Sequence, residues 1–348
     1  MKKMKALVYE KPGRKNGFIK EIDYPSCGDD EIIIKVMACG ICKPAERSHD
    51  EKGSLLGVYP AVPGHEFAGV VEEIGKDVKN FKVGDRVTAD NAVSCGTCYY
   101  CQAGKPAFCL NYKSIGHSVY GGMAEYVLVK ESMTFSIPDN LTMNEACLTE
   151  LVGCCFHCVE RADIKYGDNV LVLGCGSSGM LLAQLFKNSQ AGKVVVADVN
   201  PMKLKHIEAK GVITCQVDRE DYAKHESRLK DDFPLGFDCI IDTTGDFGLV
   251  NRCISILKKG GTFVEYSFAS TDKKSVEINI APFIANECSF IGTTFQSFSF
   301  KRCLEVMSEG KVDASFIISK EYALDEYFDA LDENLNNTDT IKMIIHPN

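Results

Sequence analysis

The chain has 348 residues, 45% of them hydrophobic and 25% charged, and its formal net charge at pH 7 is −9. This length suggests two domains with enough apolar side chains for a core in each, and the acidic balance argues against a nucleic-acid-binding or polybasic membrane-binding surface. No apolar run approaches the roughly 18–20 residues that span a bilayer, and the stretch Ala6–Tyr9 is too short for the apolar part of a signal peptide.

The first 150 residues are predicted to form a β-rich domain, because short apolar or alternating runs are separated by turns that contain Gly or Pro. The predicted strands are Ala6–Val8, Glu31–Val36, Phe67–Val71 and Arg86–Thr88. Strand alternation by itself indicates no function, and the candidate functional residues lie in the segments between these strands.

A candidate metal-binding pair lies at His65 and Glu66, directly after a Pro-Gly turn. Neutral imidazole is a usual zinc ligand, and a thiolate is its usual softer partner. Cys39 and Cys42 follow the strand predicted from Glu31, so a thiol lies at a strand end. A lone loop histidine is more often structural than a ligand, and the assignment depends on the rest of the chain.

Four closely spaced cysteines are the most specific signal in the sequence: Cys95, Cys98, Cys101 and Cys109 form a C-x2-C-x2-C-x7-C pattern. Four thiolates this close can surround one tetrahedral ion, and a closed all-sulfur site is structural because it leaves no open coordination position. We expect zinc in a lobe over about residues 93–112; an iron–sulfur cluster and unligated core cysteines are the alternatives. Seventeen cysteines without an export signal indicate reduced thiols and a cytoplasmic protein.

These features, with the run Gly121–Tyr126, resemble the zinc-dependent medium-chain alcohol and polyol dehydrogenase family, and within it the sorbitol-dehydrogenase-like members. The resemblance extends over the full length. It implies an α/β fold with a GroES-like β-rich catalytic domain, a Rossmann domain with a doubly wound parallel sheet, and a last segment that returns to the first domain. The expected boundaries are 1–152, 153–292 and 293–348.

The resemblance also implies a catalytic zinc held by three side chains. Cys42 matches the family's cysteine ligand and His65 its histidine, while Glu66 matches an acidic companion that either binds the ion or stands behind it. For the third ligand, the stretch around Glu150 resembles the Glu-Pro-Leu element of sorbitol-dehydrogenase-like members. Cys154 is the alternative, since some alcohol dehydrogenases use a thiolate here.

One position departs from the family pattern. Pro44 stands where members usually carry the Ser or Thr hydroxyl that relays the proton of the alcohol, and proline has no hydroxyl. Ser48 and His49 lie nearby in the sequence and are candidate replacements, although a Ser-His pair on a polar loop is more often plain surface. His49 is therefore included among the candidate catalytic residues.

A buried strand that leads through a glycine-rich turn into a helix is predicted from residue 169 onward. The apolar run before the turn lacks polar alternation, as in a buried parallel strand, and a G-x-G-x-x-G pattern follows it. Glycines let the backbone approach a pyrophosphate, and the helix N-terminus supplies N–H groups and a positive dipole. An ordinary βα turn is the alternative. The candidate cofactor-binding residues of this turn are Gly174, Gly176, Ser177, Ser178 and Gly179.

Asp198 ends the next predicted strand. A carboxylate there can accept hydrogen bonds from the adenosine ribose hydroxyls and would repel a 2′-phosphate. No arginine follows it directly; Lys203 does, and it is included among the candidate cofactor-binding residues. The pattern favours NAD over NADP.

Strands and helices are predicted to alternate further along the chain. A strand is expected from Phe237, a helix over Leu249–Leu257, a strand over Gly260–Tyr266 and a closing strand from Ser289. The segment from Phe295 onward contains one amphipathic helix and a final short strand.

The expected function is a zinc-dependent transfer of a hydride from a secondary alcohol or polyol to NAD, giving the ketone, with one catalytic and one structural zinc per chain. Sorbitol dehydrogenases tend to carry Phe-Arg-Tyr where this chain has Thr294-Phe295-Gln296, so threonine-like, simple secondary and bulky hydroxysteroid-like alcohols stay open as substrates. A non-catalytic zinc-binding relative is the alternative of another class. A homo-oligomer, tetramer or dimer, is expected, without nucleic-acid or membrane partners.

Overall fold

The computed structural model describes residues 2–54, 56–246, 248–267, 277–296 and 299–348. The chain divides into two compact units, one made of residues 1–153 with 296–348 and the other of residues 154–295. Helix α4 (Thr149–Ala162) contains the passage from the first unit to the second. Within the described ranges, no helix is long and apolar enough to cross a membrane.

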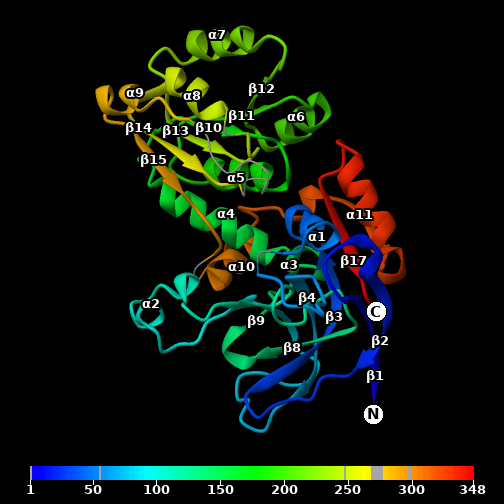
Figure 1. The fold of residues 1–348 in the computed structure, drawn as a ribbon. Coiled ribbons are helices and arrows are strands. Elements are labelled where there is room, and N and C mark those ends of the chain that lie inside the picture. Colours follow the sequence, from blue (N-terminus) through cyan, green and yellow to red (C-terminus); the bar gives the residue numbers. More distant parts are fainter. Residues whose placement is uncertain (1, 55, 247, 268–276, 297–298) are drawn as a thin grey trace. The chain divides into compact units, whose positions relative to one another are not determined.

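The first unit is built around strand β3 (Glu31–Gly40), which pairs antiparallel with three other strands. β4 runs along one edge of β3, while β8 and β17 share the other edge. The sheet order is β16-β17-β3-β4-β5-β9, with β8 beside the first half of β3. A strand from the end of the chain therefore lies next to the end of β3, close to Cys42 in the sequence (Figure 1).

Alternate side chains of β3 point into one core, as the two-residue period of a strand requires: Ile32, Ile34 and Val36 are all buried there. Two further sheets in this unit pair β1 with β2 and β6 with β7. The strands of the unit are β1 (Lys3–Tyr9), β2 (Gly17–Asp23), β3, β4 (Glu66–Ile74), β5 (Arg86–Ala89), β6 (Ala92–Val93), β7 (Lys113–Ser114), β8 (Tyr126–Lys130), β9 (Thr134–Ser136), β16 (Ile318–Ala323) and β17 (Lys342–His346).

The helices of the first unit are short and lie between these strands. Its α-helices are α1 (Lys43–Asp50), α2 (Tyr99–Gln102), α3 (Met143–Ala146), α10 (Phe300–Ser308) and α11 (Tyr327–Asn336). Its 3-10 turns are η1 (Arg14–Asn16), η2 (Pro106–Phe108), η3 (Glu131–Met133), η6 (Ser315–Ile317) and η7 (Leu324–Glu326).

The second unit is a six-stranded sheet in which every neighbouring pair is parallel, in the order β12-β11-β10-β13-β14-β15. Helices cover both of its faces, with α7, α8 and α9 over one of them (Figure 1). This arrangement confirms the predicted doubly wound parallel sheet. The strand order reverses at β10, whose neighbours are β11 and β13, and the glycine-rich turn directly follows β10.

Two neighbouring elements of the second unit differ in their bounds from the predicted ones: a helix, and the strand predicted over Gly260–Tyr266, which is β14 (Leu257–Glu265). The helix expected over Leu249–Leu257 ends at Cys253, a 3-10 turn follows, and Leu257 already begins β14. Leu257 is buried and in register with Phe237 of β13, so sheet pairing replaces the last turn of the expected helix.

The strands of this unit are β10 (Val170–Leu173), β11 (Val194–Asp198), β12 (Ile213–Gln216), β13 (Phe237–Asp242), β14 (Leu257–Glu265) and β15 (Ser289–Gly292). Its helices are α5 (Ser177–Lys187), α6 (Pro201–Ile207), α7 (Tyr222–Asp232), α8 (Leu249–Cys253) and α9 (Ile280–Ala285), with 3-10 turns η4 (Glu208–Lys210) and η5 (Ile254–Ile256).

Candidate metal and nucleotide sites

Three of the predicted ligands lie close together, where β3 ends and β4 begins. Sheet register pairs Gly40 with Glu66, so the residues just beyond the two strand ends lie side by side. The donor atoms of Cys42, His65 and Glu66 all lie within 4.8 Å of one another. Gly64, with φ +93°, makes the turn into β4, and a Cβ there would lie 2.6 Å from the backbone nitrogen of Met123. Only glycine fits that position without rearrangement.

Glu150 lies at the edge of this group. It is in the first turn of α4, is buried, and its Oε2 lies 4.0 Å from Nε2 of His65. Cys154 follows one helical turn later on the same face of α4. Cys155 is turned elsewhere, because its thiol lies 3.6 Å from the carbonyl oxygen of Ser178 in the second unit.

The donor set suits a divalent cation. Burial lowers the pKa of His65, but the neighbouring Cys42, Glu150 and Glu66 outweigh burial and raise that pKa to about 10. Nδ1 of His65 is buried without a hydrogen-bond partner among the described residues. Anionic groups that stabilise an imidazolium would equally stabilise a metal ion held by neutral imidazole and thiolate. The residues present therefore fit the predicted zinc ion.

Glu66 forms an ion pair with Lys342, a lysine that the sequence alone did not indicate. Nζ of Lys342, on β17, lies 2.7 Å from Oε1 and 2.6 Å from Oε2 of Glu66 and also donates to the carbonyl oxygen of Ile41 at 3.1 Å. Both side chains of the pair are at most 3% exposed. A buried ion pair of this geometry fixes the direction in which the carboxylate points.

His49 is fully buried, at 0% exposure, and its Nδ1 lies 2.9 Å from the hydroxyl of Tyr59. Its ring does not reach His65 directly. His117 lies between the two, with ring centroids 5.6 Å from His49 and 5.0 Å from His65. Nδ1 of His117 lies 2.8 Å from the hydroxyl of Ser54. Burial lowers the pKa of His49 to about 4 and that of His117 to about 2, which favours the neutral form of both rings.

Sequence analysis did not find His117, and the one available signal was a histidine in the glycine-rich segment before Gly121. The structure also explains why Pro44 is tolerated. It occupies the first turn of α1, where a missing N–H costs no helix hydrogen bond.

The four-cysteine pattern forms one cluster whose sulfur atoms all lie within 4.8 Å of one another. Sγ of Cys98 is 3.5 Å from Sγ of Cys101 and 3.9 Å from Sγ of Cys109. Four thiolates around a zinc ion at about 2.3 Å would be about 3.8 Å apart, so these separations fit a tetrahedral ion. Backbone N–H groups of Cys95 and Asn111 donate to Sγ of Cys109 at 3.3 Å. No disulfide links any of the described cysteines.

The predicted nucleotide turn has the backbone geometry that its glycines require. Gly174 has φ +97°, and a Cβ on Gly179 would lie 1.9 Å from the carbonyl oxygen of Gly174. Gly176, the N-cap of α5, faces open space, with no heavy atom within 4 Å of a Cβ built there. The turn is therefore tightly packed on its inner side and open where a phosphate group would approach the N–H groups of Ser177 and Ser178.

Asp198 ends β11 beside this turn. Its Oδ2 accepts the backbone N–H of Cys175 at 2.5 Å and its Oδ1 that of Asn200 at 2.7 Å. Asn200 in turn caps α6 by accepting from the N–H of Lys203, which places Lys203 in the first turn of that helix.

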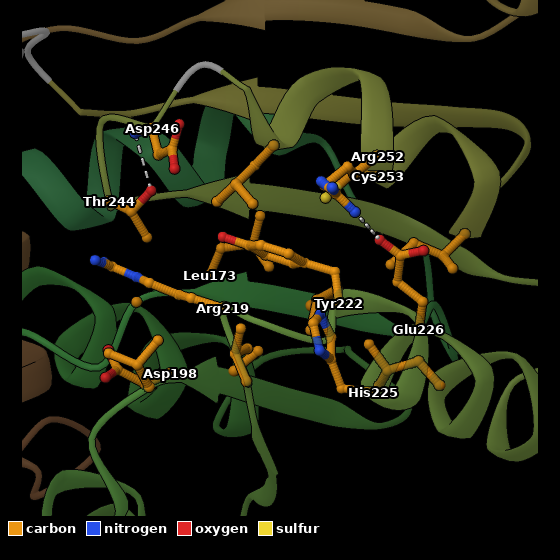
Figure 2. Close-up of a pocket in the computed structure, with 18 residues that line it drawn as sticks. Leu173, Asp198, Arg219, Tyr222, His225, Glu226, Thr244, Asp246, Arg252 and Cys253 are labelled. Carbon is orange, nitrogen blue, oxygen red and sulfur yellow. Dashed lines mark hydrogen bonds and ion pairs between the residues drawn. The ribbon is translucent and has the colours of Figure 1, made fainter.

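A cavity of about 120 Å³ opens next to Asp198 within the second unit (Figure 2). Its walls come from the ends of β10 and β11, from the loop after β12 and from helices α7 and α8. Carbon-rich walls with a carboxylate at the mouth suit the adenosine part of a dinucleotide. The lining residues include Leu173, Gly174, Asp198, Val199, Val217, Arg219, Tyr222, Thr244 and Leu249.

Both units resemble domains of known dehydrogenases. A family model described as the alcohol dehydrogenase GroES-like domain matches residues 28–139, and one described as zinc-binding dehydrogenase matches residues 179–309. The chain is 33% identical to D-arabinitol dehydrogenase 1 of Uromyces fabae, covering 99% of this chain and 97% of that one.

Two further relatives cover essentially the whole chain. Sorbitol dehydrogenase of Halalkalibacterium halodurans is 29% identical, with 99% of each chain covered. A solved structure from Sinorhizobium meliloti, described as a zinc-binding dehydrogenase and bound to NADP, superimposes with a TM-score of 0.91 at 30% identity and covers 100% of both chains.

Proposed function

The chain belongs to the zinc-dependent medium-chain alcohol and polyol dehydrogenase family, and we propose that it transfers a hydride between a secondary alcohol or polyol and NAD, giving the ketone. The observation that carries this proposal is the group formed by Cys42, His65 and Glu66, with Glu150 beside it. A mixed set of thiolate, imidazole and carboxylate donors, with the imidazole and carboxylates buried and the thiolate partly exposed, is typical of a catalytic zinc rather than a structural one.

In this proposal, Cys42, His65 and Glu150 hold the catalytic zinc. Glu66 is kept by Lys342 as a fixed negative charge next to the ion, and the four cysteines of the lobe hold a second, structural zinc. Bound in this way, the catalytic ion supplies Lewis-acid activation of the alcohol, and the nicotinamide ring supplies the hydride acceptor. The protein's own task is to place the carbinol carbon and to exclude water.

For the dinucleotide, we propose that the N–H groups after Gly176 bind the pyrophosphate and that Asp198 accepts hydrogen bonds from the ribose hydroxyls. This carboxylate favours NAD, because a 2′-phosphate would bring a second negative charge next to it. Lys203, in the first turn of α6, is proposed to add a positive charge near this site, outside the residues that line the cavity. Asp198→Ala should weaken NAD binding and narrow its advantage over NADP; wild-type protein that prefers NADP would contradict this assignment.

The proposed part of His49 is to handle the proton released by the alcohol. Since its ring is fully buried and its Nδ1 is hydrogen-bonded to Tyr59, the Tyr59 hydroxyl is the group that would pass the proton to it. His117 only stacks on His49 and His65, and stacked ring faces transfer no proton. The hydroxyl of Ser54, which is hydrogen-bonded to Nδ1 of His117, offers a second route for this proton. This arrangement would replace the hydroxyl that is missing at Pro44.

A polyol is the favoured substrate class, because the named relatives include dehydrogenases of D-arabinitol and sorbitol. We further propose the domain boundaries 1–152, 153–292 and 293–348, a cytoplasmic location and a homo-oligomer.

A two-part experiment tests the function. Elemental analysis of the purified protein should give two zinc ions per chain, and a panel of polyols and simple secondary alcohols should be screened for NADH formation. Two zinc ions and NADH formation with at least one polyol support the proposal. One zinc ion together with no NADH formation on the whole panel would indicate a structural metal and a non-catalytic relative.

A further inference from the structure

Arg219 lines the cavity beside Asp198 and has no part in the function proposed above. It lies in the loop between β12 and α7, distant in sequence from Asp198. Sheet pairing brings the two together: Asp198 is in register with Gln216, and the backbone N–H of Val217 donates to the carbonyl oxygen of Asp198 at 2.8 Å. The loop that carries Arg219 therefore leaves the sheet directly beside Asp198.

The side chain of Arg219 extends along the mouth of the cavity. In the view of Figure 2 its guanidinium group lies between Asp198 and Thr244, and all three residues line the same cavity. Lys203, the cation expected from the sequence to act here, is not among the lining residues. Arg219 thus places a positive charge at this mouth.

The guanidinium group is available to a ligand. The described residues include no hydrogen-bond or ion-pair partner of Arg219, and the side chain is exposed. The two aspartates nearest to it in this cavity make their hydrogen bonds elsewhere: Asp198 accepts the backbone N–H groups of Cys175 and Asn200, and Asp246 accepts that of Gly248. The other arginine of the cavity, Arg252, is paired with Glu226 at 3.3 Å and lies over the ring of Tyr222. An arginine that is free among paired neighbours can form a bidentate contact with a phosphate.

We propose that Arg219 binds a 2′-phosphate on the adenosine ribose and so allows the enzyme to use NADP beside NAD. The inference rests on the proposed function, since it concerns the same dinucleotide. Asp198 and Arg219 act in opposite directions: the carboxylate bonds the free ribose hydroxyls and repels a phosphate, whereas the guanidinium attracts the phosphate. The ratio of the affinities for NADP and NAD is therefore set by both Asp198 and Arg219 rather than by Asp198 alone.

The test compares two nucleotides that differ only in the 2′-phosphate. Binding of 5′-ADP and of 2′,5′-ADP is measured by calorimetry on the full-length zinc-loaded protein, for wild type, Arg219→Ala and Arg219→Lys. Loss of charge-assisted hydrogen bonds should weaken 2′,5′-ADP binding by about 10- to 100-fold in Arg219→Ala, while 5′-ADP binding changes by less than about twofold. Arg219→Lys should keep part of the affinity, because it retains the charge but not the planar fork.

Arg228→Ala is the matched control. Arg228 is an exposed arginine on α7 whose partner is Asp232, and it does not line the cavity. Its removal changes the net charge by the same amount as Arg219→Ala. The binding of both nucleotides should therefore stay unchanged. Asp198→Ala should have the opposite effect to Arg219→Ala: the affinity for 2′,5′-ADP should rise relative to that for 5′-ADP.

Three results would overturn the proposal: wild type that binds 5′-ADP but not 2′,5′-ADP, equal weakening of both nucleotides in Arg219→Ala, or an equal effect of Arg228→Ala. Equal weakening would mean that Arg219 packs on the adenine ring instead. Failure of the proposed function looks different, because then neither nucleotide binds to the wild type and no alcohol is oxidised.

Discussion

Gly40 shows at the scale of a single residue how the candidate catalytic group is accommodated. It is in register with Glu66 across the β3–β4 pair, and a Cβ built on it would lie 2.2 Å from Oε2 of Glu66. Any side chain at this position would displace the carboxylate from its place between Lys342 and the donor group. A glycine at a strand end, unremarkable in the sequence, is thus a requirement of the site.

Glu150 is the proposed third ligand of the catalytic zinc, with Cys154 as the alternative. We expect Glu150→Ala to lose one zinc ion per chain and to lower kcat by at least about 100-fold, because an incomplete ligand set no longer holds the ion. Cys154→Ala and Cys155→Ala should keep both zinc ions and stay active. Zinc content and turnover are measured on the same preparations. A Cys154→Ala protein that loses zinc while Glu150→Ala retains it would move the ligand to the cysteine.

The buried pair of Lys342 and Glu66 has a measurable energetic consequence. Lys342→Met should lower the free energy of unfolding by about 3–5 kcal/mol, because it leaves a buried carboxylate without its partner. Urea unfolding provides the measurement. The double variant with Glu66→Gln should regain part of the loss, since the uncompensated charge is then gone.

An exposed ion pair in the same unit provides the control for this loss. Lys3 is paired with Asp23 at 2.7 Å, and both side chains are more than half exposed, so Lys3→Met should cost at most about 1 kcal/mol. Equal decreases in the free energy of unfolding in Lys3→Met and Lys342→Met would show that the buried pair contributes no more to stability than the exposed one.

At the scale of an element, the segment that carries the four cysteines has little apolar support of its own. It contains only the short α2 and η2, and Tyr99, Phe108 and Leu110 in or beside them are more than half exposed. A segment without a buried core depends on cross-links for its order. The sulfur cluster is the one feature of this lobe, as described, that can supply them.

We therefore expect Cys98→Ser to lose the structural zinc and to lower the melting temperature, because three thiolates do not close the tetrahedral shell. Zinc content and a melting curve are the measurements. Cys215→Ser is the matched control, since Cys215 is a buried cysteine of the other unit with no place in either donor group; it should retain both zinc ions. Full zinc content in Cys98→Ser would refute the structural site.

At the scale of the whole molecule, each compact unit has its own buried core. One is built around β3, and the other packs helices α7, α8 and α9 against the parallel sheet. The candidate metal donors belong to the first unit and the nucleotide turn to the second. Metal and dinucleotide should consequently stabilise different parts of the chain.

Hydrogen exchange checks this separation. NAD at about 100 times its dissociation constant should stabilise the state that binds it by about 2.7 kcal/mol, and protection should increase mainly in β10, β11 and the turn between β10 and α5. A zinc chelator should instead reduce protection in residues 93–112 and in the segments around Cys42 and His65. Equal changes in both units from either treatment would contradict independent stabilisation.

Several features of this protein were determined by the sequence alone. The four cysteines, the glycine-rich turn and Asp198 at the end of its strand are encoded within short segments, where spacing restricts the chemistry directly. The family, the parallel sheet and the dehydrogenase class predicted from them are confirmed, while the ligand roles stay predictions.

Which distant residues join these segments depends on how the strands and loops pack together. Lys342 reaches Glu66 because β17 pairs with β3, His117 enters between His49 and His65 from a separate loop, and Arg219 arrives beside Asp198 through the pairing of β12 with β11. Local periodicity carries no information on such partners, since sheet pairing brings together residues that are far apart in the chain. The same reason explains the error at Leu257, where pairing with β13 ended a segment that reads locally as helix.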